Sequence, residues 1–131
     1  MFARKKQPPI RSLIAHGTRI VGHVEFRDGL RIDGEVVGDI RADDALASIL
    51  VVSESASVHG AIHADHVIIN GHVNGPVHAA NLLELQPKAR IEGDIHYKAL
   101  EMHQGAMISG QLRPEGGIEP KPTLKLAANN L

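Results

Sequence analysis

The chain carries a repeated pattern of aliphatic positions separated by polar residues. Each of five copies places four long apolar side chains at spacings of two, four or six residues. The five sets are Leu30, Ile32, Val36 and Ile40; Leu50, Val52, Val58 and Ile62; Val67, Ile69, Val73 and Val77; Leu83, Leu85, Ile91 and Ile95; and Leu100, Met102, Ile108 and Leu112. Successive copies start 20, 17, 16 and 17 residues apart. A unit this short cannot enclose a core alone, so each copy must stack on the next.

The even spacings predict strands, because side chains two, four or six residues apart along a strand face the same way. In the longer copies a further small residue faces inward, namely Ala56, Ala89 or Ala106. A glycine between two aliphatic residues, as in IVGHV and VVGDI, indicates a bend between short strands. We therefore expect an all-β, single-domain, right-handed parallel β-helix (a β-solenoid) of about six triangular turns, the first of them partial and centred on residues 20–24.

Three zones follow one another along the chain. Residues 1–15 are basic and show no periodicity, which predicts a flexible N-terminal tail. Residues 16–113 hold the repeats, and the stretch RADDALAS at 41–48 lengthens one turn. Residues 114–131 are rich in proline, which predicts a disordered C-terminal tail.

The composition fits a stack of uniform layers and narrows the function. Aromatic residues make up 2% of the chain, and a core of repeated aliphatic side chains does not need large rings to fill irregular volume. The net charge of −1 gives no bulk attraction to nucleic acid, so no nucleic-acid partner is expected. The absence of cysteine excludes disulfides and thiol catalysis and fits a reducing, cytoplasmic compartment. No apolar run approaches the ~20 residues of a membrane-spanning helix.

Five stretches of the repeat region keep a distinctive order and spacing: GTRIVGHVEF, GLRIDGEVVGDIRA, LVVSESASVHGAIHADHVIINGHVNGPVHA, LELQPKARIEGDIHYKALEM and GAMISGQL. In sequence, order and spacing they resemble the bactofilins, a family of bacterial polymer-forming cytoskeletal proteins. The resemblance implies a right-handed parallel β-helix that polymerises end to end, without nucleotide, into non-polar filaments.

The resemblance also implies a location and partners. Bactofilins associate with the cytoplasmic face of the inner membrane through the N-terminal tail. They organise cell shape, polarity or envelope synthesis alongside peptidoglycan-remodelling enzymes or other envelope proteins. One position departs from the family pattern, because many bactofilins carry phenylalanine in the last turn where this chain has Ile108.

The two ends of the stack are the candidate functional surfaces. An open strand edge over an apolar core invites another chain unless a helix or polar segment covers it, and no amphipathic helix flanks the repeats. We therefore expect polymerisation through the terminal turns. The residues assigned to this polymer interface are Ile20, Val24, Leu100, Met102, Met107, Ile108 and Leu112. The alternative is a capped monomeric solenoid, with Leu13-Ile14 or Leu124–Leu126 folded over an end, that binds a protein partner through a side face.

The first residues of the chain combine apolar and basic side chains. Met1 and Phe2 can enter the interfacial zone of a membrane while Arg4, Lys5 and Lys6 meet anionic headgroups. One such anchor is weak, but a filament that displays many copies binds through avidity. The alternative is a solvated basic tail.

Candidate metal ligands and catalytic groups are few. His63, His78 and His96 each follow the fourth aliphatic position of a turn, which predicts a surface column of histidines with Arg41 and Arg113 in phase. Ligands ~5 Å apart in a column form no tetrahedral site unless a further group converges on them, so we expect no metal or other cofactor.

The acidic residues do not indicate an active site. Asp39 and Asp94 follow bend glycines on different turns and cannot work as an acid–base pair. The sequence therefore predicts a non-enzymatic, self-assembling scaffold whose partners are further copies of itself and the membrane surface.

Overall fold

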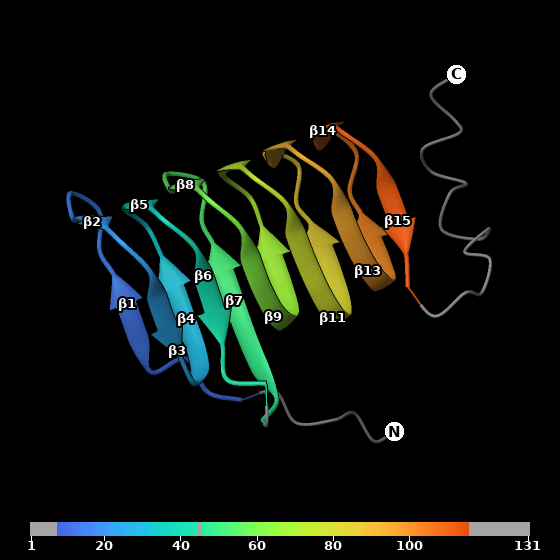
Figure 1. Cartoon of the computed structure of the whole chain (residues 1–131). Coiled ribbons are helices and arrows are strands. Elements are labelled where there is room, and N and C mark those ends of the chain that lie inside the picture. The colour runs from blue at the N-terminus through green and yellow to red at the C-terminus, as the bar shows by residue number, and fades with distance from the viewer. Residues whose placement is uncertain (1–7, 45, 116–131) are drawn as a thin grey trace.

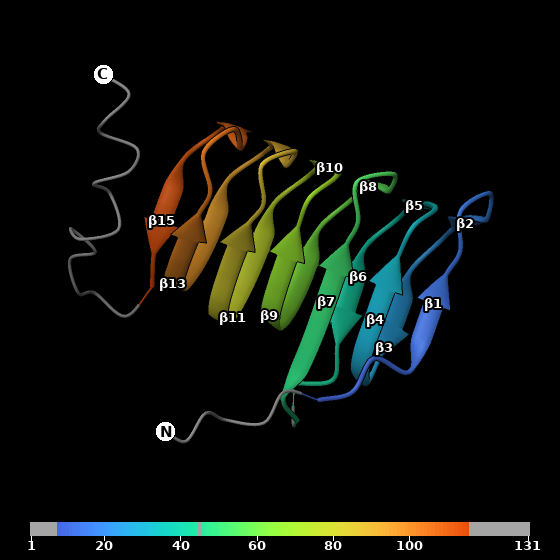
Figure 2. The same ribbon diagram turned by 180° about the vertical axis from the view of Figure 1, so that it is seen from behind.

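The computed structural model describes residues 8–44 and 46–115. These residues form fifteen strands and no helix, and the strands pair in parallel throughout. The turns follow one another along a single axis, from β1 at one end to β15 at the other (Figure 1; Figure 2 shows the same stack from behind). The predicted all-β fold, a parallel β-solenoid of about six turns, is confirmed.

Each turn contributes one segment to each of three strand ladders. The first ladder consists of β1 (Ser12–Ile14), β4 (Asp28–Ile32), β7 (Ser48–Val52) and the second halves of β9 (Ile62–Ile69), β11 (Val77–Leu85) and β13 (Ile95–Met102). The second ladder consists of β2 (Arg19–Val21), β5 (Glu35–Val37), β8 (Ser57–His59), β10 (His72–Asn74), β12 (Arg90–Glu92) and β14 (Met107–Ser109). The third ladder consists of β3 (Val24–Phe26), β6 (Ile40–Ala42), the first halves of β9, β11 and β13, and β15 (Leu112–Pro114). Because β9, β11 and β13 run from the third ladder into the first, those two ladders make one nine-stranded sheet beside a six-stranded one.

The strand register aligns the aliphatic repeats as predicted. Equivalent residues pair from turn to turn, as in the column Val36, Val58, Val73, Ile91 and Ile108. The inward side chains of the middle turns are fully buried, and they form one continuous core along the axis. Each turn therefore covers the apolar face of its neighbour.

The glycines of the repeated pentads form the predicted bends. Gly22, Gly38 and Gly60 all have positive φ, a conformation that glycine adopts without steric cost. At Gly60 a Cβ would overlap the carbonyl oxygen of Gly38 in the preceding turn. From Gly38 onward the bends thus stack closely enough to exclude any side chain, whereas a Cβ at Gly22, in the first turn, would meet nothing within 4 Å.

The N-terminal boundary of the solenoid differs from the prediction. Strand β1 lies inside the segment assigned to the tail, and Ile14 packs into the core in register with Ile32. The first turn is therefore complete, and the segment Leu13-Ile14 is one of its strands rather than a cap. The polar residue Ser12 pairs with Leu30 and occupies a position where the later turns have an aliphatic side chain. For this reason the aliphatic pattern does not reveal the first turn in full.

The predicted disordered tails fall mainly outside the described part of the chain. The structure describes neither residues 1–7 nor residues 116–131.

Candidate functional site

The C-terminal end of the solenoid presents an apolar layer. Met102, Ile108 and Leu112 occupy the last positions of three inward columns and are only partly buried. The residues one turn earlier in those columns are fully buried: Leu85, Ile91 and Ile95. The difference arises because, among the described residues, no turn follows the sixth. Leu100, also assigned to the interface, is already 94% covered within the chain, since its exposure is 6%.

The N-terminal end presents a smaller apolar layer. Ile20 and Val24 are partly buried and pack against the core from one side only. Ile14 and Phe26 complete this layer but are nearly covered by the chain itself. Ile14 was not among the sequence-based candidates. Its spacing of six and four residues to Ile20 and Val24 repeats that of Val52, Val58 and Ile62, and this spacing is the signal that identifies it.

Met107 differs from the other predicted interface residues. Its side chain is 58% exposed and lies on the outer side of β14, where it pairs in register with the exposed Arg90. It therefore lies beside the apolar layer and not within it.

Both ends also present strand edges. The six-stranded sheet ends at β2 and β14, and β1, β3 and β15 end the other sheet. Along the stack the bend glycines donate their N–H groups to the following turn, and this series ends with Gly93 N–H to the Ser109 carbonyl at 2.9 Å. For Gly110 no following turn exists within residues 8–44 and 46–115. An unpaired strand edge above an apolar layer is a template for another chain.

The predicted histidine column is present on one side face. The rings of His63 and His78 stack with centroids 4.4 Å apart, and those of His78 and His96 with centroids 4.2 Å apart. The interplanar angles are 8° and 3°, so the rings are nearly parallel. The register continues the column to Arg41 on one side and Arg113 on the other.

The surroundings of the column lower the pKa of two of its imidazoles. Burial lowers the pKa of His63 below its ordinary value, and the positive charge of Arg41 lowers it further. Burial also lowers the pKa of His78, and His63 and His96 on either side add to the effect. Neutral imidazoles are the form that can stack without repulsion and the form that can bind a metal ion.

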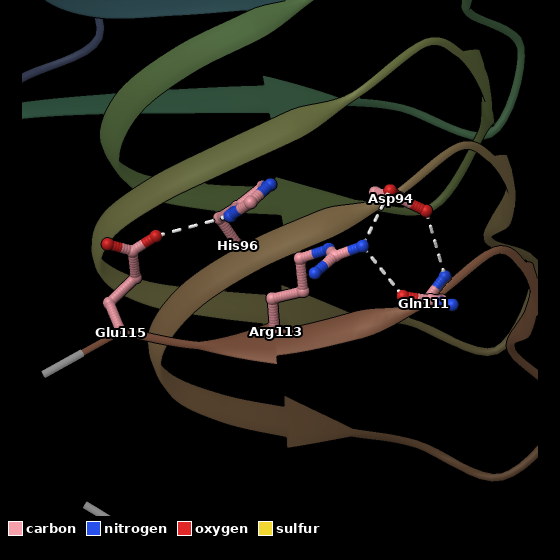
Figure 3. Close-up of polar contacts among 5 residues, drawn as sticks. All are labelled: Asp94, His96, Gln111, Arg113 and Glu115. Carbon is pink, nitrogen blue, oxygen red and sulfur yellow. Dashed lines mark hydrogen bonds and ion pairs between the residues drawn. The ribbon is translucent and has the colours of Figure 1, made fainter. Parts of the chain in front are cut away.

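At the C-terminal end of this column a carboxylate converges on the rings (Figure 3). Glu115 Oε2 lies 3.2 Å from His96 Nδ1. Arg113 turns the other way, with Nη2 donating to Gln111 Oε1 at 2.7 Å and lying 3.5 Å from Asp94 Oδ2. His78, His96 and Glu115 each offer a ligand atom, and these atoms all lie within 4.8 Å of one another. No sequence signal marks Glu115, because it follows the last repeat.

The two acidic residues singled out in the sequence are structural. Asp39 Oδ1 accepts a hydrogen bond from the Ala61 N–H at 2.9 Å, and Asp94 Oδ1 accepts one from the Gln111 N–H at 3.1 Å. Each carboxylate thus ties its own turn to the next one. The two lie on different turns and do not form a pair.

The residues predicted to bind a membrane lie outside the described residues: Met1, Phe2, Arg4, Lys5 and Lys6. Among residues 8–44 and 46–115 there is no helix of the length and hydrophobicity needed to cross a membrane.

A parallel β-solenoid with an apolar layer and open strand edges at its ends belongs to the class of folds that can accept further strands at an end. Comparison with known proteins identifies the family. The bactofilin family model, described as polymer-forming cytoskeletal, matches residues 12–113, and this chain belongs to that family. The matched range begins at the first residue of β1, in agreement with the complete first turn.

A curated relative supports the same assignment. Bactofilin BacO of Myxococcus xanthus (strain DK1622) is 27% identical over 103 residues, which cover 72% of this chain and 82% of the relative. No solved structure matches the chain. The bactofilins are a structural cytoskeletal family that self-polymerises, so the family places this chain among homopolymer-forming proteins.

Proposed function

We propose that this bactofilin polymerises end to end, through its terminal turns, into non-polar filaments that form without nucleotide. The observation that carries the proposal is the C-terminal layer of Met102, Ile108 and Leu112, which is partly exposed next to the strand edge of β14. Aliphatic burial and strand pairing hold one turn on the next within the chain. The same two kinds of interaction would then hold one subunit on another.

The energetics of such a contact are favourable in order of magnitude. Full burial of one aliphatic side chain contributes about 1.5–3 kcal/mol, and each terminal residue still has part of that contribution to gain. A contact between two C-terminal layers would bury six such side chains, three from each subunit. Backbone pairing along the strand edge adds to this and helps to offset the entropy of association.

A nucleotide requirement finds no support in the architecture. Nucleotide-dependent proteins commonly hold phosphate at the N-terminus of a helix, and the described residues contain no helix. Assembly would instead depend on subunit concentration alone.

We also propose that the filaments lie at the cytoplasmic face of the inner membrane. The apolar pair Met1 and Phe2, followed by the cations Arg4, Lys5 and Lys6, has the composition of a weak interfacial anchor, and polymerisation multiplies it. A filament held there would serve as a scaffold for cell shape, polarity or envelope synthesis, with peptidoglycan-remodelling enzymes or other envelope proteins as partners.

Sedimentation and negative-stain electron microscopy of the purified full chain at micromolar concentration test the assembly. We expect pelletable filaments in buffer without nucleotide, unchanged by added ATP or GTP. A protein that stays monomeric would instead support the capped binding module, and filaments that need nucleotide would contradict the mechanism.

Liposome flotation tests the membrane proposal separately. Deletion of residues 2–7 should abolish flotation with anionic liposomes while leaving filament formation intact. A matched variant with Arg4, Lys5 and Lys6 replaced by alanine keeps Phe2 and measures how much of the liposome binding depends on the three positive charges. Unchanged flotation of the deletion variant would refute the anchor without affecting the polymerisation proposal.

A further inference from the structure

We propose that His78, His96 and Glu115 form a binding site for a divalent transition-metal ion, represented by Zn²⁺, on the side face of the solenoid. The three ligand atoms come from three successive turns, since His78 lies on β11, His96 on β13 and Glu115 directly after β15. None of the three belongs to the terminal apolar layers, so the site does not depend on the proposed assembly mechanism.

The geometry of the three groups is close to that of a metal site. Their ligand atoms lie within 4.8 Å of one another, and His96 Nδ1 lies 3.2 Å from Glu115 Oε2. Ligand atoms of tetrahedral zinc, each ~2.0–2.2 Å from the ion, lie about 3.3 Å apart. Because the His78 and His96 rings stack nearly parallel, their in-plane lone pairs do not meet at one point, and binding of an ion requires one ring to turn out of the stack. The Glu115 side chain is 53% exposed and is free to move with that ring.

The surroundings favour a cation. The three residues line a groove of about 270 Å³ that is also lined by His63, Asp65 and Asp44, and Asp44 pairs with Arg41. The two arginines in phase with the column are held by acids, since Arg113 lies 3.5 Å from Asp94 and Arg41 lies 3.7 Å from Asp44. Their charges are therefore largely balanced, whereas Glu115 points at the His96 ring (Figure 3).

The donor set indicates the class of ion. Two imidazoles and one carboxylate form the His₂Glu set that zinc sites use when the fourth position is left to water, and the groove has room for that water. The sequence pattern predicts a column without a metal because no converging group can be seen in it. Glu115 supplies the missing group.

Metal binding would join the last three turns. An ion held by these ligands links β11, β13 and the residue after β15, and so adds a cross-turn connection to the strand pairing at the C-terminal end. Zn²⁺ should therefore raise the temperature of thermal unfolding as well as bind stoichiometrically.

Isothermal titration of the full chain with ZnCl₂ at pH 7, in a buffer that does not chelate metal, tests the proposal. We expect one Zn²⁺ per chain with a dissociation constant below about 100 µM. Co²⁺ in place of Zn²⁺ should show the visible absorption bands of a low-coordinate site. The variants His78→Ala and Glu115→Gln should each weaken binding by at least about tenfold.

Two control variants make the assignment specific. His72→Ala removes an imidazole of the second ladder, at ring distance 6.3 Å from His59, and should leave binding unchanged. Glu101→Gln alters a separate group of Glu84, Glu101 and His103, whose ligand atoms also lie near one another, and should likewise have no effect. Circular dichroism verifies the fold of each variant, and Glu115→Gln, at the exposed end of the described chain, keeps the test valid if His78→Ala disturbs folding. Absence of stoichiometric binding, or binding that Glu101→Gln abolishes and Glu115→Gln does not, would overturn the proposal.

Discussion

The substitution Ile108→Arg places a positive charge at the centre of the C-terminal apolar layer. Ile108 is the last residue of an inward column that starts at Ile20, and it is partly exposed in the single chain. An arginine at this position can extend its guanidinium into solvent along its apolar stem. We therefore expect the subunit to fold normally and the damage to fall on assembly.

The cost to a subunit contact follows from two contributions. Loss of the remaining burial of the isoleucine removes about 1 kcal/mol. Enclosing an unpaired guanidinium in an apolar contact costs at least about 3 kcal/mol. Together they weaken one contact by at least about 4 kcal/mol, or roughly a thousandfold. A two-fold symmetric contact between C-terminal ends contains the substitution twice, so its cost is about twice as large.

The size of the remaining assembly reports filament polarity as well as interface location, because polarity decides which contacts contain the substitution. In a non-polar filament, C-terminal contacts alternate with N-terminal contacts, and the variant should sediment as dimers joined through the N-terminal ends. In a head-to-tail filament every contact contains the substitution, and the variant should sediment as monomers. Analytical ultracentrifugation at micromolar concentration separates these results, and electron microscopy should show no long filaments in either case.

The matched control is Ser109→Arg on the same strand. Ser109 is exposed and points outward from β14, so a charge there adds the same residue without entering the apolar layer. We expect filaments as in the unmodified protein. Long filaments from Ile108→Arg, or equal loss of assembly from both variants, would refute the assignment of the C-terminal layer as the interface.

Three further predictions concern the bends, the histidine column and the strand edge. In an assembly-deficient variant, Gly60→Ala should lower the free energy of unfolding by about 1–3 kcal/mol more than Gly22→Ala does. The reason is that a Cβ at Gly60 overlaps the preceding turn, whereas a Cβ at Gly22 meets nothing within 4 Å. Equal melting temperatures of the two variants would contradict the close stacking of the bends. With a chelator present, the contribution of His63 and His78 to the free energy of unfolding should be complete above pH 6.5, the pKa of histidine in the unfolded chain. This contribution should be lost as the pH falls through the lowered pKa values of the folded state, because the unfolded chain binds protons more readily. Thermal melts from pH 7.5 to 5 measure this, and a variant with glutamine at both positions should show a flatter profile. Hydrogen exchange of the Gly110 amide should slow on filament formation, whereas rapid exchange in filaments would mean that the edge of β14 stays uncovered.

Most of the fold could be predicted because its physical cause is periodic. Even spacing of aliphatic residues along the chain fixes which side chains face inward, and parallel stacking then aligns them turn by turn, as the register of Ile40, Ile62 and Val77 shows. The start of the first turn could not be predicted by the same rule. A terminal turn has a neighbour on one side only, so it tolerates the polar Ser12 at a position that the interior must keep apolar.

The aromatic residues show a second limit of sequence reasoning. Uniform aliphatic layers make aromatic residues unnecessary in the middle of the stack, yet Phe26 and Tyr97 are both buried. Phe26 pairs with Ala42, and Tyr97 pairs with Ala79, so each large ring stacks beside a small residue. Burial also raises the pKa of Tyr97. The four-position repeat omits Phe26 and Tyr97, although strand alternation places them on the inward face, two residues after Val24 and Ile95.

The candidate sites divide in the same way. The histidine column follows from the repeat, since residues at one phase of successive turns must lie above one another. Glu115 could not be predicted, because its approach to His96 depends on how the chain leaves the last turn and not on the periodicity. Met107 was assigned to the apolar layer on its residue type alone, whereas its place beside the layer depends on the alternation of β14.

The ends of the solenoid cannot be recognised by composition, because they consist of the same residues as the core. Ile91 and Ile108 occupy the same column, pair directly with each other and differ in burial only because a turn follows the first and, among the described residues, none follows the second. What would distinguish an interface residue in the proposed filament is therefore its position in the stack. In the proposed contact, the C-terminal layer of a second subunit would cover Ile108 and supply the apolar burial that the following turn supplies to Ile91. Polymerisation of the proposed kind would need no dedicated binding motif, because the aliphatic side chains that fill the core inside the stack would also form the contact at its ends.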